Sequence, residues 1–179
     1  MSGRPYLSSE DSRLLREALG PYSGERYLEI GAGNAGGLVK LSKRFSTVVG
    51  TDIVRPSMSD WREAGASVVL TDGASCLRDG SFDLVAFNPP YLPVVVGGDV
   101  AVEGGEELEV PKRFLSEALR VVAPGGRVVM LLNDSSPMGP FEEECAKRGF
   151  RLQVLAKRRV FFEELTVYEA MRPMASASG

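Results

Sequence analysis

The stretch YLEIGAGNAG at residues 27–36 decides the fold, because a short apolar run leads directly into a glycine-rich turn. Residues 38–45 follow it with the spacing of a helix. Strand, glycine-rich turn and helix in succession are typical of the first unit of a nucleotide-binding α/β sheet, where glycines let the backbone approach a ligand closely. The stretch therefore predicts such a sheet, with a ligand at the carboxyl end of its first strand.

Strands and helices alternate along the rest of the chain. Further strands are predicted over residues 47–53, 66–70, 82–87, 127–132, 152–155 and 161–171. Further helices are predicted over residues 8–19, 111–122 and 138–148. The last two strands alternate apolar and polar residues, which favours antiparallel edge pairing. The pattern predicts an α/β fold: a three-layer α/β/α sandwich around a Rossmann-like, mostly parallel seven-stranded sheet with an antiparallel last strand.

Length and composition indicate one globular domain. The chain has 179 residues, of which 44% are hydrophobic and 25% are charged. We expect residues 1–173 to form a single domain and the small, polar residues 174–179 to be a disordered tail. No window approaches the ~18 consecutive apolar residues of a membrane span, and no leader pattern is visible, so we expect a cytoplasmic protein without a membrane partner.

Residue types that are missing exclude several chemistries. The chain has no histidine, which excludes Ser-His-Asp and Cys-His catalysis and imidazole proton transfer. Cys76 and Cys145 have the spacing of neither a redox motif nor a zinc ribbon, so we expect two buried, reduced thiols and no metal site. The net charge of -3 provides no overall attraction for polyphosphate.

Acidic residues stand at the predicted carboxyl ends of three consecutive strands. Asp52 stands about 20 positions after the first glycine of the turn, where such sheets hold the ribose hydroxyls. Glu29 suits a cationic sulfonium and ammonium but would repel a pyrophosphate, which favours S-adenosylmethionine over NAD. Asp72 is expected to accept a hydrogen bond from the adenine amino group, with Gly73 leaving space for the ring. The cofactor residues expected here are Glu29, Gly31, Gly33, Asp52, Ile53, Asp72 and Gly73.

The most specific motif is NPPY at residues 88–91, where the strand 82–87 ends. The side-chain oxygen of Asn88 and the carbonyl of Pro89 can accept both N–H bonds of an amide or exocyclic amine, and so favour attack by that nitrogen. The two prolines fix this geometry, and Tyr91 would pack against the planar target group. We therefore predict that Asn88, Pro89 and Tyr91 are catalytic, that Asn88 also contacts the cofactor, and that all four residues, Pro90 included, contact the substrate.

These motifs resemble those of class I S-adenosylmethionine-dependent methyltransferases, and among them the HemK-like glutamine methyltransferases of peptide-chain release factors. Glu10-Asp11-Ser12 resembles the family's opening motif, which implies that Ser12 lies near the cofactor. Residues 104–115 and 161–165 resemble the segment after the catalytic loop and the terminal hairpin. The segment before Tyr27 is too short for the recognition domain of bacterial members, so the chain is more similar to the short archaeal and eukaryotic branch.

The resemblance implies a substrate and a partner. The substrate would be the glutamine of a Gly-Gly-Gln loop in a release factor, methylated at its side-chain amide during the cycle of translation termination. The partner would be the small zinc-binding activator protein of that branch, which pairs along a sheet edge. The strand near residues 67–70 would be such an edge, and an uncovered apolar edge favours association.

Two other functions remain open at this point. The NPPY motif also occurs in enzymes that methylate the amino group of adenine in RNA or DNA. Acidic residues crowd positions 99–109 and would repel phosphates, whereas the basic residues of 147–159 are spread over helix, turn and strand, which favours a solvated surface. A non-catalytic scaffold is the third reading, but a scaffold has no physical need for the acidic set and the complete NPPY motif.

Three aromatic residues and one long connection complete the expectations. Trp61, Phe161 and Phe162 are predicted to be packing residues rather than a stacking platform for bases. The connection over residues 92–109 is long and contains four glycines, which favours a lid over the substrate.

Overall fold

The computed structural model describes residues 10–33, 38–55, 61–62, 65–89 and 109–173, and in them one seven-stranded sheet lies between helices. The strands are β1 (Gly24–Ile30), β2 (Phe45–Asp52), β3 (Ser67–Leu70), β4 (Phe82–Phe87), β5 (Val122–Asn133), β6 (Arg151–Val160) and β7 (Glu163–Met171). The helices are α1 (Glu10–Ala18), α2 (Leu38–Leu41), α4 (Glu109–Val121) and α5 (Gly139–Lys147).

The sheet has the strand order β3-β2-β1-β4-β5-β7-β6. Neighbouring strands from β3 to β5 pair in parallel, and β7 pairs antiparallel with both β5 and β6. This confirms the predicted Rossmann-like sheet with its single antiparallel strand. The chain places β2 and β3 on one side of β1 and then β4 and β5 on the other, so the strand order reverses beside β1. Open α/β sheets bind ligands at the carboxyl ends of the strands at such a point.

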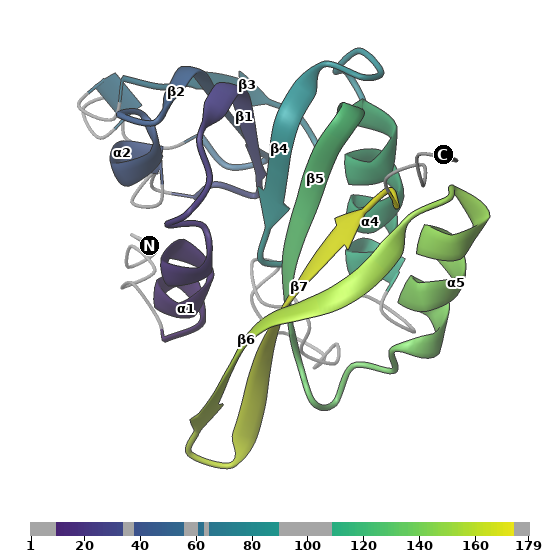
Figure 1. Cartoon of the computed structure of the whole chain (residues 1–179). Helices are drawn as coiled ribbons and strands as arrows, with labels where there is room; N and C mark the ends of the chain where they lie inside the picture. The colour runs from purple at the N-terminus through teal and green to yellow at the C-terminus, as the bar shows by residue number, and fades with distance from the viewer. Residues whose placement is uncertain (1–9, 34–37, 56–60, 63–64, 90–108, 174–179) are drawn as a thin grey trace, which may run out of the picture.

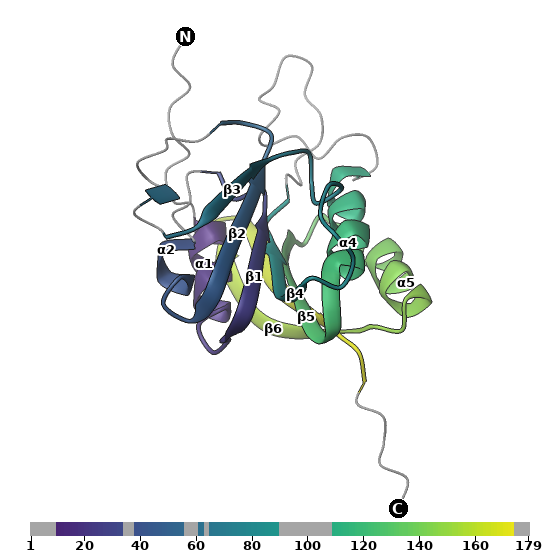
Figure 2. The same cartoon turned by 90° about the horizontal axis from the view of Figure 1, so that it is seen from above.

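Alternate residues of the central strands pack into two separate cores. Leu28 and Ile30 of β1 contact the side of the sheet covered by α4 and α5, whereas Tyr27 contacts the side covered by α1 and α2. Figures 1 and 2 show these helix pairs on opposite faces of the sheet. Tyr27, Leu28 and Ile30 are therefore buried on the two faces of β1, as expected for the inner half of a central parallel strand.

Element ends differ from the sequence expectations at a few places. The helix predicted over 38–45 ends at Leu41, because Phe45 already begins β2, where it pairs with Gly24. β5 begins at Val122 rather than 127, its pairing with β4 shifts register between Val122 and Arg127, and Gly125 in this stretch has a positive φ of 79°. β6 continues to Val160 instead of ending at 155, which lengthens the final hairpin.

The structure also tests four expectations about burial. Trp61 is 1% exposed and packs on Gly50, where a Cβ atom would lie 2.3 Å from the indole ring, so its predicted packing role is confirmed. Cys145 is buried, and burial raises the pKa of its thiol to about 12. Cys76 is exposed, so its predicted burial is wrong. Phe161 and Phe162 are also exposed, and their predicted packing role is wrong because they form the hairpin turn.

The described residues lack two kinds of feature. No helix there is long and apolar enough to cross a membrane. No group of three or more Cys, Asp or Glu side chains in this part of the chain could hold a metal ion. The predicted tail (174–179) and the predicted lid (92–108 of its 92–109) lie outside the described residues.

Candidate functional site

The carboxyl ends of β1, β2 and β4 bring most of the predicted site residues to one edge of the sheet. Ile30, the last residue of β1, pairs with Thr51 of β2 on one side and with Phe87 of β4 on the other. Asp52 directly follows Thr51, and Asn88 directly follows Phe87, so both residues flank the glycine-rich turn. Asp72 follows β3, one strand further out.

Asp52 holds the glycine-rich turn through the backbone. Its Oδ2 accepts the N–H of Gly33 at 2.8 Å, and its Oδ1 accepts the N–H of Val54 at 2.8 Å. Gly31 and Gly33 have φ values of 72° and 54°, a left-handed conformation that L side chains rarely adopt. Each Asp52 oxygen keeps a second acceptor site, so the carboxylate can hold the turn and still accept a hydroxyl proton. The side chain of Ile53 beside it is 58% exposed.

Glu29 lies directly before the first glycine of this turn. Its Oε2 accepts a hydrogen bond of 3.1 Å from the hydroxyl of the fully buried Tyr27. Burial raises the pKa of Glu29 to about 7, although the Tyr27 hydrogen bond opposes the shift. A carboxyl group of this kind gains from a neighbouring cation, because a positive charge favours its ionised form.

Asp72 and Gly73 contact helix α4, which the sequence analysis did not foresee. Asp72 pairs with both terminal nitrogens of Arg113, with 2.6 Å between Nη2 and Oδ1. A Cβ atom on Gly73 would lie 2.1 Å from Glu117, whose carboxylate accepts the N–H of Ala74. Glu117 therefore lies where a Cβ atom on residue 73 would be, which explains the glycine, and the predicted adenine contact stays a prediction.

Asn88 is held by a buried carboxylate from the first helix. Its Nδ2 donates to Oδ2 of Asp11 at 2.9 Å, and Asp11 is only 5% exposed. The other oxygen of Asp11 accepts the N–H of Ser12 at 2.7 Å. Because a carboxylate only accepts hydrogen bonds, it fixes the orientation of the Asn88 amide. The buried Oδ1 of Asn88 then accepts no hydrogen bond in the part of the chain that the structure describes.

Asp11 is a candidate site residue that sequence reasoning missed. The motif Glu10-Asp11-Ser12 implies a cofactor contact for Ser12 and assigns no role to Asp11. The available signal was its position: Asp11, Leu14 and Leu15 have the spacing of one helix face, and all three are buried. An acidic residue on the apolar face of a helix needs a hydrogen-bond donor, and here Asn88 provides it.

The NPPY motif is described only in its first half. Pro89 is buried directly after Asn88. Pro90 and Tyr91 lie outside the described residues, so their predicted contacts stay predictions.

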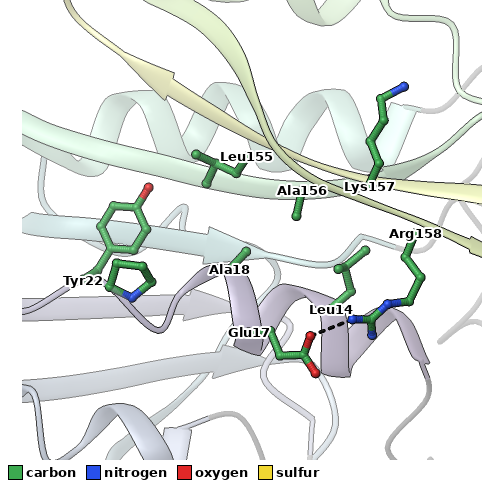
Figure 3. Close-up of a pocket in the computed structure, with 9 residues that line it drawn as sticks. Leu14, Glu17, Ala18, Tyr22, Leu155, Ala156, Lys157 and Arg158 are labelled. Atoms are coloured by element: carbon green, nitrogen blue, oxygen red, sulfur yellow. Dashed lines mark hydrogen bonds and ion pairs between the residues drawn. The ribbon is translucent and has the colours of Figure 1, made fainter.

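A separate groove of about 530 Å³ lies between α1, the turn after it and β6. Figure 3 shows Leu14, Tyr22 and Leu155 along it, with the ion pair between Glu17 and Arg158, 2.7 Å long, at its side. None of the predicted site residues that the structure describes lines this groove. It is therefore distinct from the site at the carboxyl edge of the sheet.

Most of the basic stretch at 147–159 is neutralised by acidic neighbours. Its ion pairs are Lys147–Glu143 (2.9 Å), Arg148–Glu144 (2.8 Å), Lys157–Glu164 (2.6 Å) and Arg158–Glu17 (2.7 Å). Such exposed pairs add little to stability, because solvent screens them. They confirm the predicted solvated surface, and they reduce the positive charge that a nucleic acid would need.

Sequence comparison finds relatives that are named as glutamine methyltransferases. No protein-family model matches the chain. A protein of Methanocaldococcus jannaschii named as a candidate protein N5-glutamine methyltransferase is 30% identical, with 93% of this chain and 91% of that protein covered. A release factor glutamine methyltransferase of Deinococcus radiodurans is 28% identical, with 60% of this chain and 45% of that protein covered.

Solved structures share the fold over nearly the whole chain. A chain of the Mtq2–Trm112 complex of E. cuniculi, responsible for methylation of the translation termination factor eRF1, aligns with a TM-score of 0.78 at 24% identity. That alignment covers 94% of this chain and 98% of the other. The N-methyltransferase NodS of Bradyrhizobium japonicum, solved with S-adenosyl-L-homocysteine, aligns with a TM-score of 0.64 at 14% identity, covering 97% and 90% of the two chains.

Proposed function

We propose, because the chain belongs to the protein N5-glutamine methyltransferase family, that it methylates the side-chain amide of the glutamine in the Gly-Gly-Gln loop of a release factor. One observation carries this proposal: Asp11 orients Asn88 so that the buried Oδ1 is left as an acceptor beside the glycine-rich turn. An acceptor in that position suits a substrate nitrogen that carries two protons. The release factor as substrate is supported by the named activities of the Deinococcus relative and of the Mtq2–Trm112 complex.

The residues at the carboxyl edge fit S-adenosylmethionine as the methyl donor. Glu29 would pair with the ammonium group, because burial disfavours the ionised form of its carboxyl group and a nearby cation would favour it. Asp52 would accept the ribose hydroxyls while it continues to hold the turn. When bound, the cofactor supplies an activated methyl group together with its own leaving group. The shared fold with NodS, solved with S-adenosyl-L-homocysteine, supports this choice.

Asp72 and Gly73 have a narrower role in this proposal. The Asp72 carboxylate is already paired with Arg113, so an adenine amino group would share it with the guanidinium. Position 73 favours glycine because Glu117 occupies the space that a Cβ atom would need. The helix α4 therefore helps to define the adenine end of the site. Ser12 and Ile53 lie next to Asp11 and Asp52, and their predicted cofactor contacts remain part of the proposal.

The catalytic work of the chain consists of holding the amide. The Oδ1 of Asn88 would accept one N–H of the glutamine side chain, and the Pro89 carbonyl would accept the other. Both acceptors stabilise positive charge as it develops on the attacking nitrogen. Tyr91 and Pro90 would complete the contacts with the planar group. No side chain has to act as a general base, which agrees with a chain that has no histidine.

A small activator protein is the proposed partner, and β3 is its proposed contact. β3 stands at the end of the strand order and pairs only with β2 among the described strands. Leu70 at its end is 56% exposed. An uncovered edge strand offers unpaired backbone groups to another protein. The Mtq2–Trm112 complex supports a two-chain enzyme, and a zinc-binding activator acting with this chain in the cytoplasm is the form that we propose.

Methylation assays with two substrate classes test the function. The enzyme, with and without the activator, is incubated with S-adenosylmethionine and either a release factor or adenine-containing RNA and DNA. We expect methylation of the release factor only. Methylation of the nucleic acids alone would replace the proposal by adenine methylation, and cofactor binding without any transfer would favour a scaffold.

A further inference from the structure

The turn of the final hairpin presents two adjacent aromatic side chains to solvent. β6 and β7 pair as far as Val160 and Glu163, with one register shift between Val154 and Ala156, and Phe161 and Phe162 form the turn between them. Phe161 is 90% exposed and Phe162 is 95% exposed. Single exposed apolar residues are common on protein surfaces, but two neighbouring phenylalanines at this exposure gain nothing from the fold that carries them.

Backbone strain at Phe161 makes the pair more unusual. Its φ is 53°, and it is the only residue other than glycine with a positive φ in the part of the chain that the structure describes. Glycine or asparagine adopts this conformation more readily, and the left-handed region is strained for a bulky residue. The turn therefore keeps an aromatic residue where local structure favours a small or polar one.

The hairpin turn lies on the same side of the molecule as the candidate active site. Phe87, the last residue of β4, is level with Met130 of β5, which pairs with Tyr168 of β7. From that level β7 runs back toward its start at Glu163, past the end of β5 at Asn133. At about 3.3 Å per residue the turn extends roughly 15 Å beyond Asn88 along the strand direction. Figure 1 shows the hairpin projecting beyond the ends of β4 and β5.

The hairpin is a paired two-stranded arm, and exposed ion pairs link it to helix α1. Lys157 of β6 pairs with Glu164 of β7 at 2.6 Å, close to the turn. Arg158 pairs with Glu17 at 2.7 Å and with Glu10 at 3.6 Å, which ties β6 to helix α1. The same helix carries Asp11, which holds Asn88. A contact made by a paired β-hairpin loses less conformational entropy on binding than one made by a free loop.

We propose that Phe161 and Phe162 dock the protein substrate, by contacting an apolar surface of the release factor outside the loop that carries the glutamine. The proposal rests on the proposed function. A folded protein whose loop enters the site at Asn88 has its body next to the carboxyl edge, within reach of an arm of this length. Charges of both signs, Lys157 and Glu164 among them, flank the turn, so it lacks the one-sign field that would attract a nucleic acid.

The test compares two substrates of different size. The double variant Phe161→Asn/Phe162→Ser removes both aromatics, and asparagine tolerates the left-handed conformation, so the turn should persist. Val154→Ser is the matched control, because Val154 is also exposed on β6 but lies away from the turn. Substrates are the whole release factor and a short synthetic peptide with the Gly-Gly-Gln loop. We expect the KM for the release factor to rise about tenfold or more in the double variant, with kcat unchanged. The control variant and the kcat/KM for the peptide should match wild type.

Each other result overturns the docking role. An unchanged KM for the release factor would show that the turn does not contact it. An equal loss on the peptide would place the effect in the active site or the fold. A double variant that sediments as a smaller species than wild type, without substrate, would show that the turn binds a second copy of this chain. If the wild type methylates neither substrate, the proposed function fails first, and that failure is visible before any variant is compared.

Discussion

The side-chain nitrogen of Asn88 lies 2.9 Å from Oδ2 of Asp11, a residue 77 positions earlier in the chain. This hydrogen bond joins the first helix to the end of β4, so α1 forms part of the site as well as covering the sheet. It also decides which end of the amide would face the proposed substrate. The remaining oxygen of Asn88 is buried and accepts no hydrogen bond among the described residues, as a preorganised acceptor should.

Asn88→Ala tests the acceptor itself. Removing one preorganised polar contact to the reacting group is expected to lower kcat roughly 10²- to 10³-fold. Cofactor affinity should change much less, because the glycine-rich turn and the acidic residues remain. Single-turnover kinetics and calorimetry with S-adenosylmethionine measure the two effects separately. Full turnover by this variant would refute the role of Asn88.

Two substitutions at Asp11 separate orientation from burial. Asp11→Leu fills the space without an acceptor, so the Asn88 amide can turn, and we expect a fall in kcat of about 10²-fold. Asp11→Asn retains a carbonyl oxygen that can accept from Asn88, and activity should recover to within about tenfold of wild type. Equal activity of the two variants would show that Asp11 has only a structural role.

Glu29 gives cofactor binding a pH dependence. Because its folded pKa of about 7 lies above 4.5, the carboxyl group is protonated below pH 7 in the free protein and cannot pair with an ammonium group. The affinity for S-adenosylmethionine should therefore rise with pH up to about 7 and then level off, by at most tenfold per pH unit. Glu29→Gln should bind weakly with little pH dependence, as titration calorimetry between pH 5.5 and 8.5 can show. A flat profile in the wild type would contradict the assignment.

The same raised pKa affects the stability of the ligand-free protein. Between pH 4.5 and 7 the folded state binds more protons at Glu29 than the unfolded state does. The contribution of this group to the free energy of unfolding therefore decreases as pH rises through that window. Denaturant titrations should therefore show that the free energy of unfolding of the wild type falls relative to that of Glu29→Gln as pH rises from 4.5 to 7. A relative increase over this range would contradict the raised pKa.

Asp52→Ala should act on cofactor binding first. The substitution removes the acceptor for the N–H groups of Gly33 and Val54, so the turn loses its support. We expect a clearly raised Kd for S-adenosylmethionine and a smaller change in kcat at saturating cofactor. Asp52→Asn keeps one acceptor oxygen, so its Kd for S-adenosylmethionine should lie between those of the wild type and Asp52→Ala. If Asp52→Ala lowers kcat but not affinity, the proposed place of the cofactor is wrong.

The sequence predicted the sheet well because its signals are local. The apolar run before Gly31 and the acidic strand ends place β1, β2 and the switch point without knowledge of packing. Asp11 escaped notice because its role depends on α1 packing beside the end of β4, a contact between distant parts of the chain. Likewise, nothing local indicates that Glu117 of α4 fills the room beside Gly73.

The phenylalanine pair shows the opposite error. Apolar residues in a strand pattern are normally packed, so the sequence favours burial for Phe161 and Phe162. Their exposure follows from the length of β6, which moves the turn to these two residues. A strand end can be misplaced by a few residues from sequence alone, and here that shift changes a packing pair into a surface feature.

The most direct test of the central claim is the site of methylation in the substrate. An archaeal-type release factor and its Gln→Ala loop variant are incubated with the enzyme and S-adenosylmethionine, with and without the activator, and their intact masses and fragment spectra are recorded. The account predicts one added methyl group, located on the glutamine of the Gly-Gly-Gln loop, and no gain in the variant. A methyl group on the Gln→Ala variant, or no gain on either protein although the cofactor binds, would contradict it.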